Sequence, residues 1–147
     1  MPKIIFRKIT MMVVLCLTGC VCRDGGFTYY CTVKVLDQEE QPVPNIRVLV
    51  VDNADSTPAD FVNTPSRIAL TNVQGLATPF VATGLTWGGC PGPTEAPIPE
   101  NPGILFLWVE HPQHGWQCDQ LEIQEQQITG RRPAELWIDL GTITLTE

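Results

Sequence analysis

One ten-residue segment, EHPQHGWQCD at residues 110–119, gathers the side chains of this sequence that could bind a metal. Glu110, His111 and His114 supply a carboxylate and two imidazoles, and the two histidines are the only ones in the chain. Carboxylates and imidazoles are ligands for zinc and iron. A proline and a glycine within the segment indicate a turn, however, and turns commonly expose histidines to solvent. A zinc or iron site and a solvent-exposed turn are therefore alternative interpretations.

Two tryptophans lie beside glycines, where an aromatic side chain can meet a ligand. Trp87 precedes a pair of glycines, and Trp116 follows one. An exposed indole in such a place could stack on a sugar ring or anchor a partner protein. Trp87 and Trp116 are thus candidate ligand contacts, and the alternative is that they cover the open end of the fold. Trp108 and Trp137 fall within apolar runs and are predicted to be core residues.

Hydrolytic chemistry finds little support in the sequence. The nucleophile motif G-x-S-x-G is absent, and only two serines, Ser56 and Ser66, follow residue 20. The adjacent acids Glu39 and Glu40 lie in a polar segment, which indicates a solvated loop rather than a glycosidase pair. We therefore expect no catalytic residues and no enzyme activity.

The first nineteen residues have the pattern of an export signal. Lys3, Arg7 and Lys8 form a basic region, and an apolar core at 9–17 follows it. A core of this length would rise only about 14 Å as a helix, against about 30 Å of membrane hydrocarbon. We therefore expect residues 1–19 to be a cleaved signal peptide and not a permanent span.

The quartet that ends this segment, Leu17-Thr18-Gly19-Cys20, resembles the lipobox of bacterial lipoproteins. The resemblance implies that Cys20 receives a diacylglyceryl group, becomes the new N-terminus and holds the protein at a membrane of the cell envelope. The alternative is an ordinary secretory signal cut nearby, which leaves Cys20 free or disulfide-bonded. Val21 stands where inner-membrane retention signals place Asp, which favours the outer membrane.

Four further cysteines, Cys22, Cys31, Cys90 and Cys118, follow Cys20. An even number in an exported chain predicts disulfides, because the compartment is oxidising. Three pairings are possible. We favour Cys22 with Cys31, which closes a short loop, and Cys90 with Cys118, which closes a longer one. A zinc site built from these cysteines is not favoured, since no C-x-x-C spacing is present.

The charge of the mature chain limits its partners. Six basic and sixteen acidic residues follow Cys20, so the net charge is 6 − 16 = −10. Such a surface repels phosphate backbones and anionic lipid headgroups, so we expect no nucleic-acid partner. Membrane attachment must then come from acyl chains. The 147 − 19 = 128 residues that remain are sufficient for one domain with its own core.

Beyond residue 30 the apolar residues alternate with period two, in short runs separated by proline, glycine and asparagine, which predicts strands. The predicted strands are 31–36, 45–52, 66–72, 76–82, 104–111, 116–123 and 135–145. The sequence therefore predicts an all-β protein with a single-domain, seven-stranded β-sandwich over residues 30–147. Residues 20–29 are expected to form the lipidated N-terminus and a tether.

Three local features refine this prediction. Gly75 can adopt positive φ in a turn between two strands, which predicts a hairpin. In the last strand Ile143 falls on the opposite parity to Leu140, and a β-bulge at Gly141 would correct the mismatch. Residues 82–103 are rich in proline and glycine and are expected to form a long loop.

The segments VKVLDQEEQPVPNIRVLVVD, TNVQGLATPFV, LFLWVEHPQHGW and IDLGTITL together resemble the carboxypeptidase regulatory-like, transthyretin-like (prealbumin-like) β-sandwich. Gln41 and Asn45 replace glycines that are usual in that family. The resemblance implies a non-catalytic accessory or interaction module, with recognition by loops at the ends of the sandwich. We expect the 82–103 loop and the 111–117 turn to contact an envelope protein or a glycan.

Intradiol dioxygenases use a related sandwich and hold iron with two tyrosines and two histidines. This chain has two tyrosines, Tyr29 and Tyr30, which are adjacent. Adjacent residues on a strand point to opposite faces, so a regular strand could not direct both to one iron. The H-x-H spacing of that family is also absent. The sequence therefore does not predict a dioxygenase site.

Overall fold

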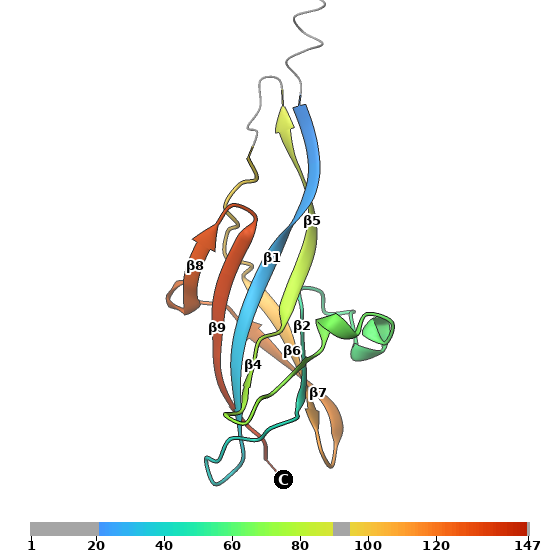
Figure 1. Cartoon of the computed structure of the whole chain (residues 1–147), viewed down its shortest axis with the longest axis vertical. Helices are drawn as coiled ribbons and strands as arrows, with labels where there is room; N and C mark the ends of the chain where they lie inside the picture. Colours follow the sequence, from blue (N-terminus) through green and yellow to red (C-terminus); the bar gives the residue numbers. More distant parts are fainter. Residues whose placement is uncertain (1–20, 90–94, 147) are drawn as a thin grey trace, which may run out of the picture.

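The computed structural model describes residues 21–89 and 95–146, and in this part the chain forms nine strands in two sheets (Figure 1). Three short 3-10 turns, η1 (Pro58–Phe61), η2 (Pro65–Arg67) and η3 (Glu125–Gln127), are its helical elements. None of the described helices has the length and apolar character needed to cross a bilayer. The predicted signal peptide and Cys20 lie outside the described residues.

The first sheet has the order β4-β1-β9-β8, and β5 also pairs with β1. Its strands are β1 (Val21–Leu36), β4 (Leu76–Ala77), β5 (Phe80–Gly89), β8 (Ile128–Arg132) and β9 (Glu135–Thr144). The second sheet has the order β3-β2-β6-β7. Its strands are β2 (Arg47–Val51), β3 (Ala69–Leu70), β6 (Ile104–His111) and β7 (Gly115–Glu122). Pairing is antiparallel throughout except between β1 and β9, which run parallel.

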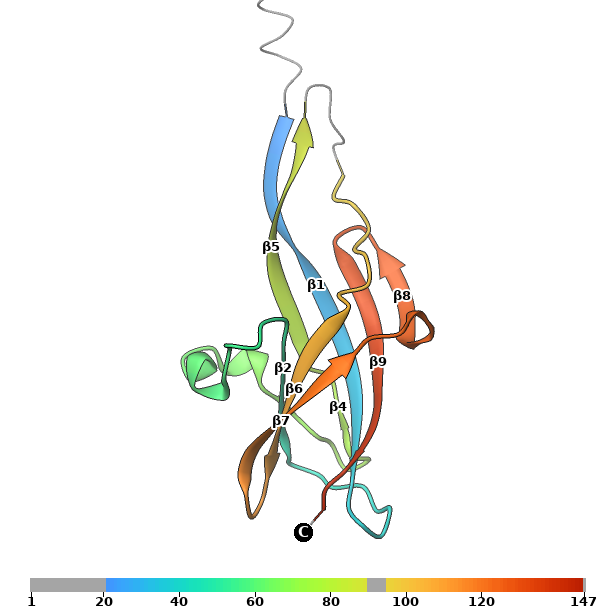
Figure 2. The ribbon, with the colours of Figure 1, turned by 180° about the vertical axis from the view of Figure 1, so that it is seen from behind.

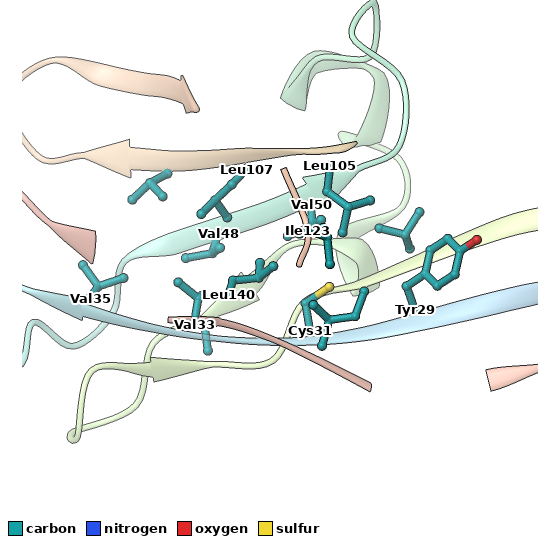
Figure 3. Close-up of a cluster of buried hydrophobic side chains, with 14 of the residues drawn as sticks. Tyr29, Cys31, Val33, Val35, Val48, Val50, Leu105, Leu107, Ile123 and Leu140 are labelled. Atoms are coloured by element: carbon teal, nitrogen blue, oxygen red, sulfur yellow. The ribbon is translucent and has the colours of Figure 1, made fainter. Parts of the chain in front are cut away.

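The core lies between the sheets and follows the alternation of the strands (Figure 3). Every second residue of β6, from Leu105 to His111, is buried, and Val33 and Val35 of β1 face them from the other sheet. The predicted all-β sandwich is confirmed. The described residues form two more strands than the seven predicted. The strand β8 was not predicted, and the predicted 76–82 strand is divided into β4 and β5.

Strand β1 is the longest element and begins directly after Cys20. Sixteen residues at about 3.3 Å each extend about 50 Å, and Figures 1 and 2 show β1 and β5 continuing past the body as a two-stranded ribbon. The tether predicted at 20–29 is therefore wrong for Val21 onward, since β1 pairs with β5 from Val21 opposite Gly89. A Cβ at Gly26 would collide with the Thr83 carbonyl oxygen, so this glycine permits close pairing.

The β-bulge predicted at Gly141 is confirmed. Thr32 lies opposite Asp139 and Lys34 opposite Thr142, so β9 contains one extra residue at this point. Gly141 has φ 81° and its N–H donates to the Asp139 carboxylate at 2.9 Å. Because of the bulge, Leu140 before it and Ile143 after it both pack on the core.

The turn at Gly75 forms with the expected positive φ of 72°, but the predicted hairpin is wrong. The short strands on its two sides belong to different sheets, since β3 pairs with β2 and β4 pairs with β1. Asn72 holds the turn, accepting the N–H of Gln74 at 2.8 Å and that of Leu76 at 3.1 Å. The segment thus crosses from one layer of the sandwich to the other.

Substitution of Gly75 by alanine should destabilise the fold strongly. The new Cβ would strain a positive-φ residue and also collide with the Val35 carbonyl oxygen and with Pro42. We expect a loss of about 2 to 4 kcal/mol in the free energy of unfolding. Gly141→Ala is the matched control, because φ there is also positive but the space is open, and it should lose only about 1 kcal/mol. Equal losses in urea unfolding would contradict the role of the collision at Gly75.

Candidate functional site at the distal end

Two turns meet at one end of the molecule, which we name the distal end: the 37–43 turn between β1 and β2, and the 111–115 turn between β6 and β7. Only the second of them lies in a segment that was predicted to take part in recognition. Figures 1 and 2 place both turns at the end opposite the start of β1. The Asp37 carboxylate fixes the first turn, accepting the N–H of Glu39 at 2.9 Å and that of Gln41 at 2.8 Å.

The metal site predicted from Glu110, His111 and His114 is not formed. Glu110 and His111 are consecutive in β6, so their side chains point to opposite faces of the sheet. The two imidazoles do lie together, with ring centroids 4.5 Å apart. No group of three or more His, Cys, Asp or Glu that could hold a metal ion occurs among residues 21–89 and 95–146.

His111 faces inward and is 6% exposed. Its Nδ1 accepts the backbone N–H of Gln113 at 3.1 Å. Beside it lies a cavity of about 310 Å³, which we name the distal pocket. Its wall includes Asp37, Glu39, Val43, His111, Gln113 and Leu145. The buried histidine is therefore not the solvent-exposed turn residue that the alternative interpretation expected, and it lines a cavity with two carboxylates.

Glu110 points to the outer face of the second sheet and forms a two-bonded ion pair with Arg47 of β2. Both side chains are partly exposed, at 50% for Arg47 and 29% for Glu110. The hydrogen bonds from Arg47 lower the pKa of the Glu110 carboxyl, against the smaller opposing effect of burial. Arg47 was not predicted from the sequence, although the alternation of β2 already placed it on the face opposite the core.

Trp116 of β7 lies next to this ion pair. The Arg47 guanidinium carbon is 5.5 Å from the centroid of the Trp116 ring. Trp116, Arg47, Pro58 and Val62 line a groove of about 330 Å³ between the sheet and η1, which we name the tryptophan groove. Val62 is 72% exposed, so the groove is open to solvent. Trp116 therefore lines an open groove, and its role as a ligand contact stays a prediction.

The other tryptophans differ from the predictions. Trp87 lies in β5 opposite Arg23 and not in a turn, and its side chain lies outside the described residues. Trp108 and Trp137, predicted as core residues, are half-buried on outer faces because their neighbours on the strands occupy the core. Trp137 stacks on Tyr30 at 5.4 Å. The indole N–H of Trp108 is buried without a hydrogen-bond partner among the described residues.

The favoured disulfide pairing is wrong for the cysteines that the structure describes. Cys31 and Cys118 are both free, the first in the core and the second exposed on β7. Cys22 is nine positions from Cys31 on the same strand, about 30 Å away, and a disulfide needs Cα atoms within about 7 Å. Cys90 lies outside the described residues. Burial raises the pKa of the Cys31 thiol to about 12, so it stays protonated.

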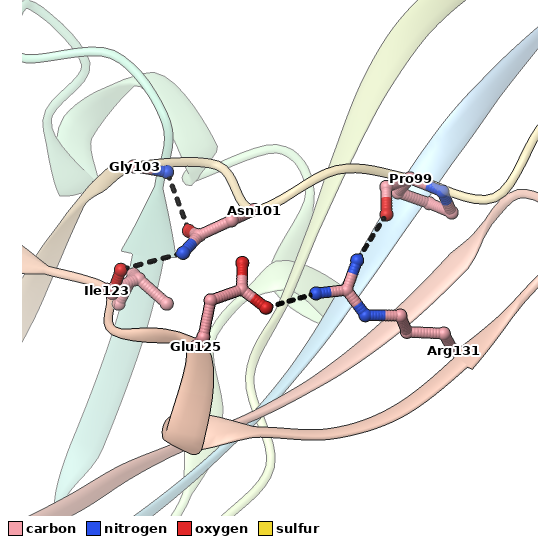
Figure 4. Close-up of polar contacts among 6 residues, drawn as sticks. All are labelled: Pro99, Asn101, Gly103, Ile123, Glu125 and Arg131. Carbon is pink, nitrogen blue, oxygen red and sulfur yellow. Dashed lines mark hydrogen bonds and ion pairs between the residues drawn. The ribbon is translucent and has the colours of Figure 1, made fainter.

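The predicted 82–103 loop is largely ordered structure. Residues up to Gly89 belong to β5, and the segment 95–103 is held against the sandwich by polar contacts (Figure 4). Asn101 donates to the Ile123 carbonyl at 2.8 Å and accepts the Gly103 N–H at 2.9 Å. Arg131 donates to the Pro99 carbonyl and pairs with Glu125 at 2.6 Å. Residues 95–103 thus form a fixed extended strap, and a role of this segment in recognition stays a prediction.

No family model matches the sequence, and no curated protein matches it. Two solved structures share part of the architecture. One is 3-chlorocatechol 1,2-dioxygenase from Rhodococcus opacus, with 13% identity and a TM-score of 0.45 over 84% of this chain and 62% of that one. The other is a mutant of catechol 1,2-dioxygenase from Acinetobacter radioresistens, with 13% identity and a TM-score of 0.41 over 82% and 53%. This chain thus spans less than two thirds of either.

The prediction that this chain is not an enzyme is contradicted by this comparison, because both matched structures are enzymes, and it is withdrawn. At this identity and TM-score the likeness assigns no reaction or site residue to this chain. The two tyrosines point to opposite faces of β1, as predicted from their adjacent positions. Tyr29 is 9% exposed and packs in the core, whereas Tyr30 is 37% exposed on the outer face.

Removal of the Glu110 charge should weaken the fold only where that carboxyl is ionised. Because the folded-state pKa is lowered, the ion pair stabilises the protein above the ordinary carboxyl pKa, and this stability is lost as pH falls through the lowered value. We expect Glu110→Gln to be less stable than wild type at pH 7, with the gap closing as the pH falls below the ordinary carboxyl range. Chemical unfolding of both proteins at pH 7 and at a pH below the ordinary carboxyl range tests the prediction. A gap of constant size would show that the introduced amide merely packs worse than the carboxylate.

Proposed function

We propose that this chain is a lipid-anchored cell-envelope protein, held by acyl chains on Cys20, whose β-sandwich binds an envelope glycan at the end opposite the anchor. The observation that carries the proposal is the direction of β1. It begins at Val21, next to the proposed lipid, and spans about 50 Å toward the distal end. The strand would therefore hold both the distal pocket and the tryptophan groove away from the membrane surface.

Several sequence features support the envelope location. The basic and apolar N-terminal pattern and the lipobox-like quartet before Cys20 agree in position and residue type. Val21 after that cysteine favours the outer membrane. The segments that resemble the carboxypeptidase regulatory-like sandwich favour an accessory role in recognition. The negative charge of the mature chain makes a nucleic acid an unsuitable partner.

The tryptophan groove favours a sugar as the ligand. A pyranose ring offers a face of C–H groups that packs against an indole, while its edge carries hydroxyl groups. Trp116 supplies the aromatic surface, and the partly exposed Arg47–Glu110 pair supplies donors and acceptors beside it. Pro58 and Val62 extend the apolar wall. Aromatic stacking with a charged hydrogen-bonding pair at its edge suits a sugar better than an extended apolar ligand.

The lipid anchor can be tested by metabolic labelling. When the full chain is produced in a bacterium fed an alkyne analogue of palmitate, we expect label and membrane association. Cys20→Ala should lose both, because no other thiol lies at the proposed cleavage site. Cys16→Ala and Cys22→Ala are controls that should keep both. Unchanged labelling of the Cys20 variant would refute the anchor, whatever its glycan binding.

The glycan site can be tested with a defined oligosaccharide. We expect a β-1,4-linked tetramer of N-acetylglucosamine to bind the detergent-solubilised full chain, measured by calorimetry. Trp116→Ala should weaken binding about tenfold or more through loss of stacking, while Trp116→Tyr should retain most of it. Thermal unfolding confirms that each variant is folded. If the alanine variant binds the tetramer as well as wild type does, the tryptophan groove is not a glycan site.

A further inference from the structure

We propose that the distal pocket is a second binding site, separate from the tryptophan groove, for a ligand that carries a primary ammonium group and an oxygen acceptor on an aliphatic stem. Three chain segments that are far apart in the sequence build its wall: the 37–43 turn, the end of β6 at His111, and Leu145 directly after β9. Its volume of about 310 Å³ is sufficient for an amino-acid-sized molecule.

The 37–43 turn supplies two carboxylates with free bonding capacity. Oδ1 of Asp37 accepts two backbone N–H groups, which fixes the side chain, and its Oδ2 has no partner among the described residues. Glu39 uses only its backbone in this turn, since its carbonyl accepts the Gln41 side-chain amide at 3.1 Å. The described ion pairs involve neither acid. The carboxylates therefore offer acceptors that an ammonium group can satisfy.

His111 supplies the complementary donor. Its side chain is more than nine-tenths buried, and Nδ1 already accepts the Gln113 N–H. The proton of the neutral ring is therefore on Nε2, for which no partner occurs in the described part of the chain. This N–H is therefore free to donate to a ligand in the pocket. An oxygen acceptor on the ligand would satisfy this N–H while the ammonium group binds the carboxylates.

The rest of the wall selects the stem of the ligand. Val43 and Leu145 pack on the core and present apolar surface, and Pro112 adds to it. No lysine or arginine of the described residues lines the pocket, so the two acids give it a negative potential. That potential favours a cation and disfavours a plain carboxylic acid. The occupant is thus an amino-acid-like amine, either free or as the lysine side chain of a partner.

A series of small probes separates these requirements. We expect 6-aminohexanoate to bind the detergent-solubilised full chain in calorimetry, pentylamine to bind less tightly because it lacks the acceptor, and hexanoate not to bind. Comparable binding of Nα-acetyl-lysinamide would identify a lysine side chain as the source, and its exclusion would identify a free amino acid. Binding of hexanoate equal to that of 6-aminohexanoate would overturn the proposal.

Variants of the 37–43 turn distinguish a built site from general attraction to an acidic surface. Glu39→Gln should weaken 6-aminohexanoate binding about tenfold, since it removes a charge-assisted hydrogen bond. Asp37→Asn should act similarly while keeping Oδ1 for the turn. Glu40→Gln is the matched control, because Glu40 lies in the same turn but outside the pocket wall. Equal losses of 6-aminohexanoate binding in Glu39→Gln and Glu40→Gln would overturn the proposed site. If the variants of the 37–43 turn still bind the N-acetylglucosamine tetramer, the tryptophan groove is independent of the distal pocket.

Discussion

The fold depends on one continuous strand that must satisfy partners on both edges. β1 pairs with β4 and β5 along one edge and with β9 along the other. Alternate side chains of β1 pack in the core, namely those of Tyr29, Cys31, Val33 and Val35. Because the side-chain period of a strand is two, a shift of one residue in the pairing of β1 would direct these side chains to solvent. The bulge at Gly141 shifts the register of β9 by one residue, so that β9 continues to pair with β1 on both sides of it.

Alternation was enough to predict the layers of the sandwich but not all of its strands. Val48 and Val50 lie two positions apart in the predicted strand 45–52, and both are buried in the core. β5 was not recognised beyond residue 82, because glycine-rich sequence normally indicates a loop. In the ribbon of β1 and β5, glycine supports strand pairing instead, since Gly26 allows the two backbones to approach closely. A single sequence does not distinguish a glycine that breaks a strand from one that permits close pairing.

The distal end shows the same limit of prediction from a single sequence. Grouping Glu110 with His111 ignored strand parity, which already required the two side chains to diverge. The sequence therefore contained the reason that the metal site fails. It did not contain the partners that replace it, because Arg47 and the acids of the 37–43 turn reach this end only through the pairing of β2 with β6 and the return of the C-terminal strand. Contacts between distant segments depend on topology, which local patterns do not specify.

The parallel pairing of β1 with β9 also has a consequence for the order of events in folding. Thr32 and Asp139, neighbours in the sheet, are 107 positions apart in the chain. Loop closure of this size is slow relative to local hairpin formation. Because β1 precedes β9 in the chain, β1 stays without its parallel neighbour until β9 has been synthesised. The first sheet is therefore completed only when β9 joins β1, and until that step β1 presents an unpaired edge.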